Sequence, residues 1–451
     1  MATALIVLAA GRGTRMNSDL PKVMHQIAGA PLFAHALASG DALAPDRAVL
    51  VVGHGADLVE AAAKDIDPDI TIAIQEEQLG TGHAVAQTRA ALKDFKGDAI
   101  VLYGDTPFIQ PETIEAMAAA RTNGADVVVL GFEAADPGRY GRLILSDGEL
   151  DRIVEFKDAT AEEGAVTLCN SGLIAADAEL LFDLLDEVGN DNATGEYYLP
   201  DIVSIARGRG LRASVVTCDE SETLGINSRS ELANAEEIFQ ANARAAALEN
   251  GVTLIARDTV YFSFDTIVGR DTVIEPNVVF GPGVTVESGA TIRAFSHLEG
   301  CHVSRGGVVG PYARLRPGAE LAEHAKVGNF VEIKNAQIEE GAKVNHLSYV
   351  GDARVGEHAN IGAGTITCNY DGVSKHHTDI GARSFIGSNT CLVAPVTVGD
   401  EAMTATGTVV TKDVPNGAMA VGRARMEVKP GLAVKLFEKL RAAKARRQKG
   451  S

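Results

Sequence analysis

An aliphatic side chain returns at every sixth residue through most of the second half of the chain, and this period constrains the fold more than any other feature. It begins after about residue 252 and continues, with single-residue slips and one longer interruption, to Val410. Each six-residue unit is one short flat face whose aliphatic side chain points inward, and three units close a triangular coil. Stacked coils bury a continuous core, so we predict a parallel β-helix rather than an irregular β-rich domain. The inward positions are Val268, Ile274, Phe280, Val286, Ile292, Leu298, Val303, Val309, Leu315, Leu321, Val327, Ile333, Ile338, Val344, Val350, Val355, Ile361, Ile380, Ile386, Leu392, Val398, Thr404 and Val410.

The first half follows a different rule, because short apolar runs alternate with helical stretches up to about residue 227. The predicted strands are residues 4–10, 48–53, 70–75, 99–103 and 126–131, and the predicted helices are 31–40, 57–65, 82–92 and 111–123. The alternation predicts an α/β doubly wound, Rossmann-like domain over 1–227, whose parallel sheet binds ligands at the carboxyl ends of its strands. Residues 228–250 form the predicted linker helix, and 251–451 the β-helix domain with a basic tail.

The composition excludes several classes of function. The formal charge is −19, from 60 acidic against 41 basic residues, which argues against general nucleic-acid binding. No apolar run reaches the roughly 18 residues of a membrane span. The five cysteines are scattered without a CxxC pair, as expected for free thiols in a reducing cytoplasm. With this net charge, anionic substrates would need local basic residues or a metal.

A glycine-rich turn follows the first predicted strand as Leu8-Ala-Ala-Gly-Arg-Gly-Thr-Arg-Met16, and Leu20-Pro-Lys22 comes just after it. Such a turn lets backbone N–H groups approach phosphates. It lacks the Gly-Lys of a Walker A loop and the third glycine of a dinucleotide fingerprint. Arg15 and Lys22 add two cations beside the turn, which suits a triphosphate. Taken alone, the same side chains would be ordinary surface charges.

Two further segments of this half carry candidate ligand-binding residues. Asp105 follows the fourth predicted strand, where a carboxylate beside a phosphate loop is a natural Mg²⁺ ligand, although a lone Asp there is more often a turn or capping residue. Gln75 begins the segment that ends in Gly-Thr-Gly-His-Ala84, and its side chain offers both the donor and the acceptor that a nucleobase edge requires. His83 is expected to begin a helix rather than to act in catalysis.

The six-residue period is interrupted once, between Thr367 and Ile380. Thirteen residues separate the two where six are expected, so seven protrude, and a protruding loop on a regular prism usually carries function. His346 and Lys334 follow inward positions nearby and should point outward. An outward histidine beside outward bases suggests a general base and an anionic substrate, against the alternative of a solvated surface. The basic tail from Lys435 to Ser451 is either a solvated helix or an aid in holding a polyphosphate.

The motifs of the two halves resemble two known activities. LAAGRGTRM, LPK, QLGTGHA and YGD are similar to motifs of the sugar-1-phosphate nucleotidyltransferases. GPYARLRPGAEL, VGNFVEIK, NHLSYVGDA and NIGAGTITCNYDG resemble the bifunctional bacterial enzymes that join a glucosamine-1-phosphate N-acetyltransferase to an N-acetylglucosamine-1-phosphate uridylyltransferase. Both halves match in order over nearly the whole chain. The resemblance implies a left-handed β-helix of hexapeptide repeats, a cytoplasmic homotrimer, and small-molecule substrates with neither nucleic acid nor membrane as partner.

In the uridylyltransferase half, the resemblance implies a site that uses UTP and Mg²⁺ and acts by positioning and charge neutralisation. Arg15 and Lys22 would be the catalytic cations, and Gln75 would read uracil. Asp105 and Asn227 match the Mg²⁺ ligands. The positions that match nucleotide- and sugar-binding residues are Leu8, Ala9, Ala10, Gly11, Lys22, Gln75, Gly80, Thr81, Tyr103, Gly104, Asp105, Gly141, Glu155, Asn170 and Asn227. Phe156 departs from the family pattern, which has His at that position.

In the acetyltransferase half, His346 matches the general base that would take a proton from the amine of glucosamine-1-phosphate, and Glu332 is a candidate for orienting it. The positions that match sugar-phosphate contacts are Arg316, Lys334, Tyr349 and Asn360. The positions that match acetyl-CoA contacts are Ala363, Asn369, Tyr370, Ser388, Thr406 and Arg423. Thr406 departs from the family's usual Ala. Two other functions stay open: a single-activity nucleotidyltransferase whose β-helix is non-catalytic, and an inactive scaffold.

Overall fold

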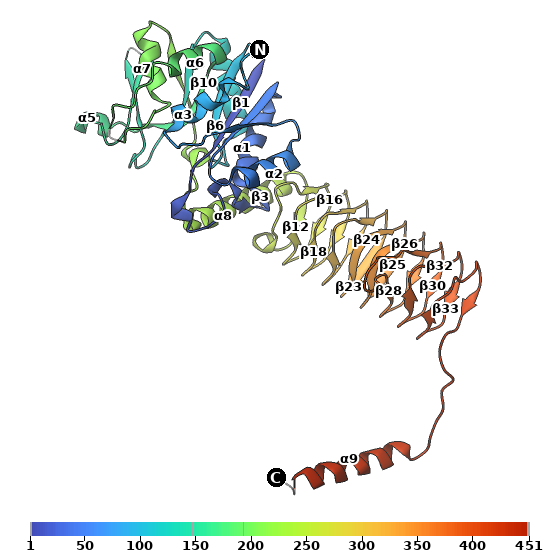
Figure 1. Ribbon diagram of the computed structural model, residues 1–451. Coiled ribbons are helices and arrows are strands. Elements are labelled where there is room, and N and C mark those ends of the chain that lie inside the picture. The colour runs from blue at the N-terminus through green and yellow to red at the C-terminus, as the bar shows by residue number, and fades with distance from the viewer. Residues whose placement is uncertain (1, 147, 193, 449–451) are drawn as a thin grey trace. The chain divides into compact units, whose positions relative to one another are not determined.

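The computed structural model describes residues 2–146, 148–192 and 194–448. Contacts divide the chain into two compact units, of which the first contains the residues up to Ala246 and Phe262–Thr266, and the second contains Ala247–Tyr261 and the residues from Ile267 onward (Figure 1). Within the described residues, no helix has the length and apolar character needed to cross a bilayer.

The first unit is built on a sheet of order β11-β7-β10-β6-β1-β4-β5, with a hairpin of β8 and β9 beside β10. Its strands are β1 (Thr3–Ala9), β4 (Arg47–Val52), β5 (Thr71–Ile74), β6 (Asp98–Tyr103), β7 (Val127–Glu133), β8 (Arg142–Ser146), β9 (Glu149–Val154), β10 (Leu168–Asp177) and β11 (Ala213–Cys218). All five predicted strands are present. The prediction of a parallel sheet is confirmed for these five strands, whereas β10, which was not predicted, runs antiparallel to both β6 and β7.

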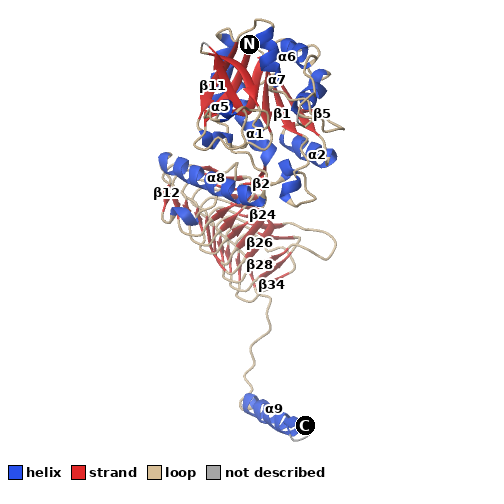
Figure 2. Cartoon of the chain, turned by 90° about the vertical axis from the view of Figure 1, so that its left-hand side faces the viewer, coloured by secondary structure: helices blue, strands red, loops and turns tan. Residues whose placement is uncertain are grey.

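Helices cover both faces of this sheet, as the alternation predicts (Figure 2). One face packs against α1 (Leu32–Gly40), α2 (Ala56–Ile66) and α4 (Pro111–Thr122). The other packs against α3 (Thr81–Ala86), α6 (Ala178–Leu185) and α7 (Asp201–Gly208). The alternation of β1 explains the two cores, because Leu5 and Val7 face the first set of helices while Ile6 and Leu8 face the second. A short helix, α5 (Ala161–Gly164), follows the hairpin.

The predicted linker helix is α8 (Arg229–Glu249). Its apolar residues, among them Ala235 and Phe239, pack against Ile27 and Ile226 of the first unit. The Gln240 side chain is buried and exchanges hydrogen bonds of 2.7 and 2.8 Å with the backbone of Phe262. The apolar face and this amide account for the inclusion of most of α8 and of residues 262–266 in the first unit.

The second unit is a left-handed parallel β-helix whose successive coils pair in register 17 or 18 residues apart, except where the protruding loop lengthens one coil. One face consists of β12 (Thr253–Leu254), β14 (Val273–Ile274), β17 (Thr291–Ile292), β20 (Val308–Val309), β23 (Lys326–Asn329), β25 (Lys343–His346), β27 (Asn360–Ile361), β30 (Phe385–Ile386), β33 (Met403–Thr404) and β35 (Met419–Ala420). The strands of the other two faces are β13 (Ile267–Val268), β15 (Val279–Phe280), β16 (Val284–Val286), β18 (His297–Leu298), β19 (Cys301–Val303), β21 (Arg314–Leu315), β22 (Ala319–Leu321), β24 (Glu332–Ile338), β26 (Tyr349–Val355), β28 (Ile366–Cys368), β29 (Thr378–Ile380), β31 (Cys391–Val393), β32 (Val396–Val398) and β34 (Val409–Val410).

The six-residue period is confirmed by burial. Every inward position from Ile274 to Val410 is at most 3% exposed, whereas Val268 in the first coil is partly exposed. The interruption is also confirmed, because residues 369–377 form a loop between β28 and β29. The described part of the basic tail lies within α9 (Leu432–Gln448).

Candidate active sites

In the first unit, the glycine-rich turn brings Lys22 close to the end of β1. Gly13 has φ of 59°, and a Cβ atom there would lie 2.5 Å from the Cβ of Lys22. The turn can therefore pack against Lys22 only with glycine at this position. Arg15 lies exposed in the same turn, and no ion pair to it is present among the described residues.

Lys22 is held by two oxygens from distant parts of the chain. Its ammonium group donates to Asp105, in the turn that follows β6, and to the Asn227 amide oxygen at 3.0 Å. The backbone N–H of Ile226 donates to the Asp105 carbonyl at 2.9 Å, which brings Asn227 beside Asp105. The Asn227 amide nitrogen donates to the Gly225 carbonyl at 3.3 Å, which turns the amide oxygen toward Lys22.

A cavity of about 300 Å³ lies over this cluster. The predicted residues that line it are Leu8, Ala10, Gly11, Lys22, Gln75, Gly80, Thr81, Tyr103 and Asp105. Ala9 and Gly104 do not line it: Ala9 packs into the core on the other face of β1, and the Gly104 N–H donates to the Leu8 carbonyl at 2.9 Å, which joins the end of β6 to β1. A cation, a glycine-rich turn and an amide-bearing loop thus share one cavity.

Gln75 is 3% exposed, although its side chain reaches the cavity. Its amide nitrogen donates to the Gly80 carbonyl at 3.1 Å and lies 3.1 Å from Nδ1 of His83. Gly80 has φ of 112°, and a Cβ there would lie 2.5 Å from the Tyr197 carbonyl oxygen. A second cavity, of about 640 Å³, shares Gln75 with the first and is lined also by Arg12.

The three predicted sugar-binding residues meet at one place. A Cβ on Gly141 would lie 3.2 Å from a carboxylate oxygen of Glu155 and 3.6 Å from the Cβ of Asn170. Burial raises the pKa of Glu155, and the carboxylates of Asp201 and Asp158 raise it further. Burial also raises the pKa of Tyr103 above its usual value. Phe156, at the position of the family's His, is 46% exposed, with the Arg142 guanidinium 5.8 Å from its ring centre.

In the second unit, the site begins with one corner of the β-helix. From Phe295 onward, seven successive coils turn this corner with a residue whose φ lies between 51° and 77°. These corner residues are Phe295, Tyr312, Phe330, Leu347, Gly364, Asn389 and Gly407. The residues directly before them form what we call the pre-corner column: Ala294, Pro311, Asn329, His346, Ala363, Ser388 and Thr406. Four predicted site residues therefore share one column, and the corner beside them changes from bulky side chains to small ones.

His346 is exposed, as the sequence predicts, and its Nδ1 lies 2.6 Å from the amide oxygen of Asn329, one coil earlier. The backbone N–H of Leu347 donates to the Asn329 carbonyl at 3.1 Å and fixes the two coils to each other. The suggestion that Glu332 orients His346 was wrong for this structure. Glu332 accepts instead from the Arg316 guanidinium at 2.8 Å.

The face after the corner gathers the remaining basic residues. Lys334 lies against Lys375 of the protruding loop, and this second ammonium group lowers the pKa of Lys334. The hydroxyl of Tyr349 would lie 2.3 Å from a Cβ on Gly351, so the ring lies across this glycine. Arg316, Lys334 and Lys375 thus form a cationic surface in a chain whose net charge is negative.

The protruding loop is tied to this face by Asp352. The Asp352 carboxylate accepts from the amide of Asn369 at 2.5 Å and from that of Asn335 at 2.7 Å. Burial raises the pKa of Asp352, but these two hydrogen bonds and the nearby lysines lower it to a net value below the usual range. Tyr370 is 60% exposed, and its hydroxyl donates to the Gly372 carbonyl at 2.6 Å.

The remaining predicted residues divide between two places. Ala363, Ser388 and Thr406 follow His346 in the pre-corner column, and the guanidinium of Arg423 donates to the Thr406 carbonyl at 2.5 Å. Asn360 lies in β27, on the face before the corner. A single chain therefore does not place Asn360 on the face that carries Lys334 and Tyr349.

Comparison with known proteins covers both units. A MobA-like NTP transferase domain matches residues 5–172, and the bacterial transferase hexapeptide (six repeats) matches residues 265–300. The bifunctional protein GlmU of Ruegeria sp. is 68% identical over 450 residues, which are 100% of both chains. Those of Roseobacter denitrificans and Dinoroseobacter shibae are 66% and 68% identical, over 100% and 99% of both chains.

The chain belongs to the bifunctional GlmU family. The contacts in the structure add three residues near the acetyltransferase site that sequence reasoning missed: Asn329, Asp352 and Lys375. Lys375 could have been found as the basic residue of the protruding loop. Asn329 could have been found by writing the coils one beneath another, because it stands one position before a corner, as His346 does.

The first unit also offers a place for a metal ion. Asp105 and Asn227 direct two oxygens at one cation, the Lys22 ammonium. Hard oxygen donors, few in number, suit Mg²⁺, which keeps several ligand positions for water and phosphate. Among the described residues, no group of three or more His, Cys, Asp or Glu side chains could hold a metal.

Proposed function

We propose that this chain carries out two reactions: acetyl-CoA-dependent N-acetylation of glucosamine-1-phosphate in the second unit, and uridylyl transfer from UTP to N-acetylglucosamine-1-phosphate in the first. The products of the second reaction are UDP-N-acetylglucosamine and pyrophosphate. One observation carries the proposal. This chain is similar to members of the family over its full length, and each of its two units holds one cluster of residues suited to one of the two reactions.

For uridylyl transfer, the first unit supplies position and positive charge. An oxygen of the sugar phosphate forms a bond to the α-phosphorus, the bond to the β-phosphate oxygen breaks, and pyrophosphate leaves. The attacking phosphate is already anionic, so no general base is needed. Lys22 and Arg15 stabilise the charge that develops on the phosphates, and Gln75 and Gly80 hold the uracil end in the cavity.

Mg²⁺ would be held by Asp105 and Asn227. When bound, it neutralises charge on the triphosphate. Lys22 now has these two oxygens as its partners, so the same oxygens serve either the ammonium group or the metal. We infer that Lys22 turns toward the phosphates when the metal is held. Glu155, Gly141 and Asn170 contact the N-acetylglucosamine moiety.

For acetyl transfer, Nε2 of His346 takes a proton from the 2-ammonium group of glucosamine-1-phosphate. The freed amine nitrogen forms a bond to the thioester carbonyl carbon and the carbon–sulfur bond breaks. The nitrogen gives up its surplus proton as the amide forms, and that proton goes to the departing thiolate. Arg316, Lys334 and Lys375 hold the sugar phosphate. The pre-corner column from Ala363 to Thr406, with Arg423, carries acetyl-CoA, while Tyr349, Asn369 and Tyr370 line the acetyl end.

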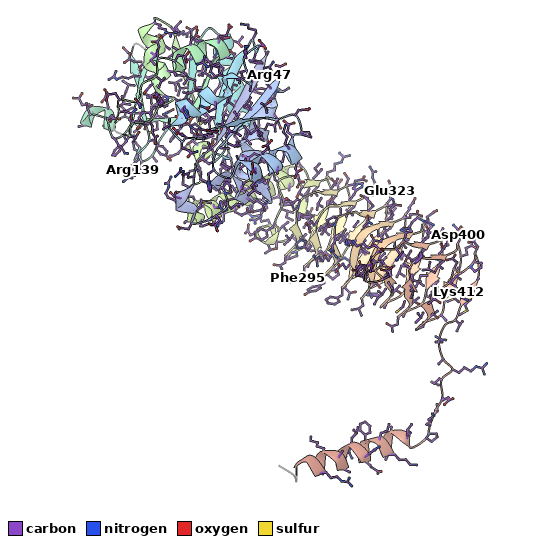
Figure 3. The ribbon with its side chains drawn as sticks, in the orientation of Figure 1. Arg47, Arg139, Phe295, Glu323, Asp400 and Lys412 are labelled. Carbon is purple, nitrogen blue, oxygen red and sulfur yellow. The ribbon has the colours of Figure 1, made fainter. Side chains whose placement is uncertain are left out.

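We further propose a cytoplasmic homotrimer. Phe295, Tyr312 and Phe330 stack with ring centres 4.8 and 5.2 Å apart, and all three rings remain about half exposed (Figure 3 labels Phe295). Such a row beside His346 suits contact with another copy, which would bring its Asn360 to this site. Light scattering should give three times 47.1 kDa, and a monomer would contradict the trimer.

The release of free CoA thiol tests the bifunctional proposal. Wild-type protein with acetyl-CoA and glucosamine-1-phosphate should release thiol, whereas His346→Ala should not. The same preparation should form pyrophosphate from UTP and N-acetylglucosamine-1-phosphate. Glu323→Gln is a matched control on the β-helix surface, because Glu323 is exposed and lies on the opposite side from the corner residue Phe295 (Figure 3). Pyrophosphate formation without thiol release would leave a single-activity nucleotidyltransferase.

A further inference from the structure

The hydrogen bond between Asn329 and His346 involves the proposed general base and is not explained by any predicted role. The two residues are register partners in the adjacent strands β23 and β25. Nδ1 of His346 lies 2.6 Å from the Asn329 amide oxygen. An amide oxygen can only accept, so Nδ1 must be the protonated nitrogen.

We propose that Asn329 is a positioning residue for acetyl transfer, whose amide oxygen holds His346 in the tautomer with the proton on Nδ1. This inference rests on the proposed function of His346 as general base. Nε2 then keeps its lone pair for the ammonium proton of the sugar. In the opposite tautomer Nε2 carries a hydrogen and cannot accept a proton.

The β-helix holds Asn329 ready for this contact. The next residue, Phe330, stacks on Tyr312 with the ring planes 22° apart, and the Asn329 carbonyl accepts from Leu347. The preceding residue, Gly328, approaches the next coil so closely that a Cβ would lie 2.0 Å from the Asn345 carbonyl oxygen. Two neighbours along the chain and one across the coils thus fix the backbone that presents the amide.

An amide does this task differently from a carboxylate. A carboxylate would also accept from Nδ1, but its negative charge would stabilise the protonated imidazole and make His346 a worse acceptor at low pH. Glu332, the nearby carboxylate, is instead paired with Arg316. The arrangement fixes the tautomer without placing a negative charge on the ring.

Two substitutions separate positioning from mere support of the fold. Asn329→Ala should lower kcat for acetyl transfer by about tenfold to a hundredfold, a part of what a general base contributes, with little change in KM. Asn329→Asp should recover much of kcat at high pH, while the acid limb of its pH profile moves to higher pH. Uridylyl transfer by both variants, and both activities of Glu323→Gln, should equal the wild type.

The tautomer itself is the deciding readout, and it does not depend on turnover. Solid-state ¹⁵N NMR of the full-length protein labelled at histidine should show a protonated Nδ1 in the signal that His346→Ala removes. Asn329→Ala should move that proton to Nε2. The inference is overturned if wild-type His346 carries its proton on Nε2, or if Asn329→Ala leaves tautomer and kcat unchanged. Failure of the proposed function is distinct, because wild-type protein would then release no thiol at all.

Discussion

The two units assemble their candidate sites in opposite ways. In the first unit, Leu8, Gln75, Asp105 and Asn227 come from segments far apart in the chain and meet where β1 and β6 end. In the β-helix, Asn329, His346, Ala363 and Ser388 are neighbours because each is one coil after the last. The first site therefore depends on how loops close over a cavity, and the second on the spacing between coils.

The two sites also differ in how far their charged residues are exposed to solvent, and this suits them to different reactions. The charged groups of the first site are partly buried. The Lys22 ammonium group is paired with oxygen atoms there, and burial raises the pKa of Glu155. The second presents its histidine and lysines on an outer surface. A reaction that neutralises a triphosphate suits the first arrangement, and one that binds a long cofactor along a column suits the second.

The largest effect should come from Asp105→Ala. Loss of this carboxylate removes one of the two proposed Mg²⁺ ligands, and uridylyl transfer should fall by about a hundredfold or more. Acetyl transfer should keep its wild-type rate, because no residue of that site depends on Asp105. Pyrophosphate and thiol assays on one preparation measure both rates. Loss of both activities in a folded protein would contradict the separation of the sites.

Gly328→Ala should disturb the β-helix site through coil spacing. A Cβ there would lie 2.0 Å from the backbone oxygen of Asn345, which cannot move aside as a side chain would. We expect the β-helix to be destabilised by about 1–3 kcal/mol and acetyl transfer to fall more than uridylyl transfer. Thermal unfolding followed by circular dichroism measures the first effect. Gly281→Ala is the matched control, since the nearest atom is Cγ of Glu299 at 3.2 Å.

Arg423→Ala should have a smaller and more selective effect. The guanidinium is exposed and donates to Thr406 in the proposed acetyl-CoA column. Its removal should raise KM for acetyl-CoA by about tenfold, the equivalent of about 1.4 kcal/mol, with kcat nearly unchanged. Initial rates at varied acetyl-CoA measure this. An unchanged KM would remove Arg423 from the cofactor site.

The smallest effect should be that of Glu155→Gln on the stability of the folded protein. The pKa of Glu155 is raised in the folded protein, so its charged form opposes folding, and stability falls as pH rises from the usual glutamate range through the folded-state value. Glu155→Gln should therefore be more stable than the wild type at pH 8, by less than about 1 kcal/mol, with the difference shrinking toward pH 4.5. Melting temperatures across this range measure it. A stability difference that grows toward low pH would contradict the raised pKa of Glu155.

The sequence predicted most of both folds because the inward period and the strand–helix alternation are local patterns. It predicted neither β10 nor its antiparallel direction. An apolar run that forms a buried strand looks the same in either direction, and the pairing of β10 is decided by residues far away in the chain. The inward positions needed no such information. Each is buried by the identical positions of neighbouring coils.

Sequence motifs were enough to identify most residues of the candidate sites. They did not show which side chains bond to one another, and those contacts determine what each residue can do. The spacing of residues in the sequence does not show that the Gln75 amide nitrogen donates to the Gly80 carbonyl. Nor does it show that Glu332 accepts from Arg316, while His346 is hydrogen-bonded to Asn329. Such contacts depend on side-chain geometry across coils and loops. Likewise, the motif around Asn360 does not show on which face of the β-helix this residue lies. That face is set by where the chain turns the corner.

Complementation between two inactive variants tests the central claim of two separate sites most directly. Asp105→Ala and His346→Ala are each given glucosamine-1-phosphate, acetyl-CoA, UTP and Mg²⁺, and UDP-N-acetylglucosamine is measured by mass spectrometry. Each variant alone should form little product, and an equal mixture should restore it, because one protein acetylates what the other then uridylylates. A mixture as inactive as its components, with both proteins folded, would contradict the account.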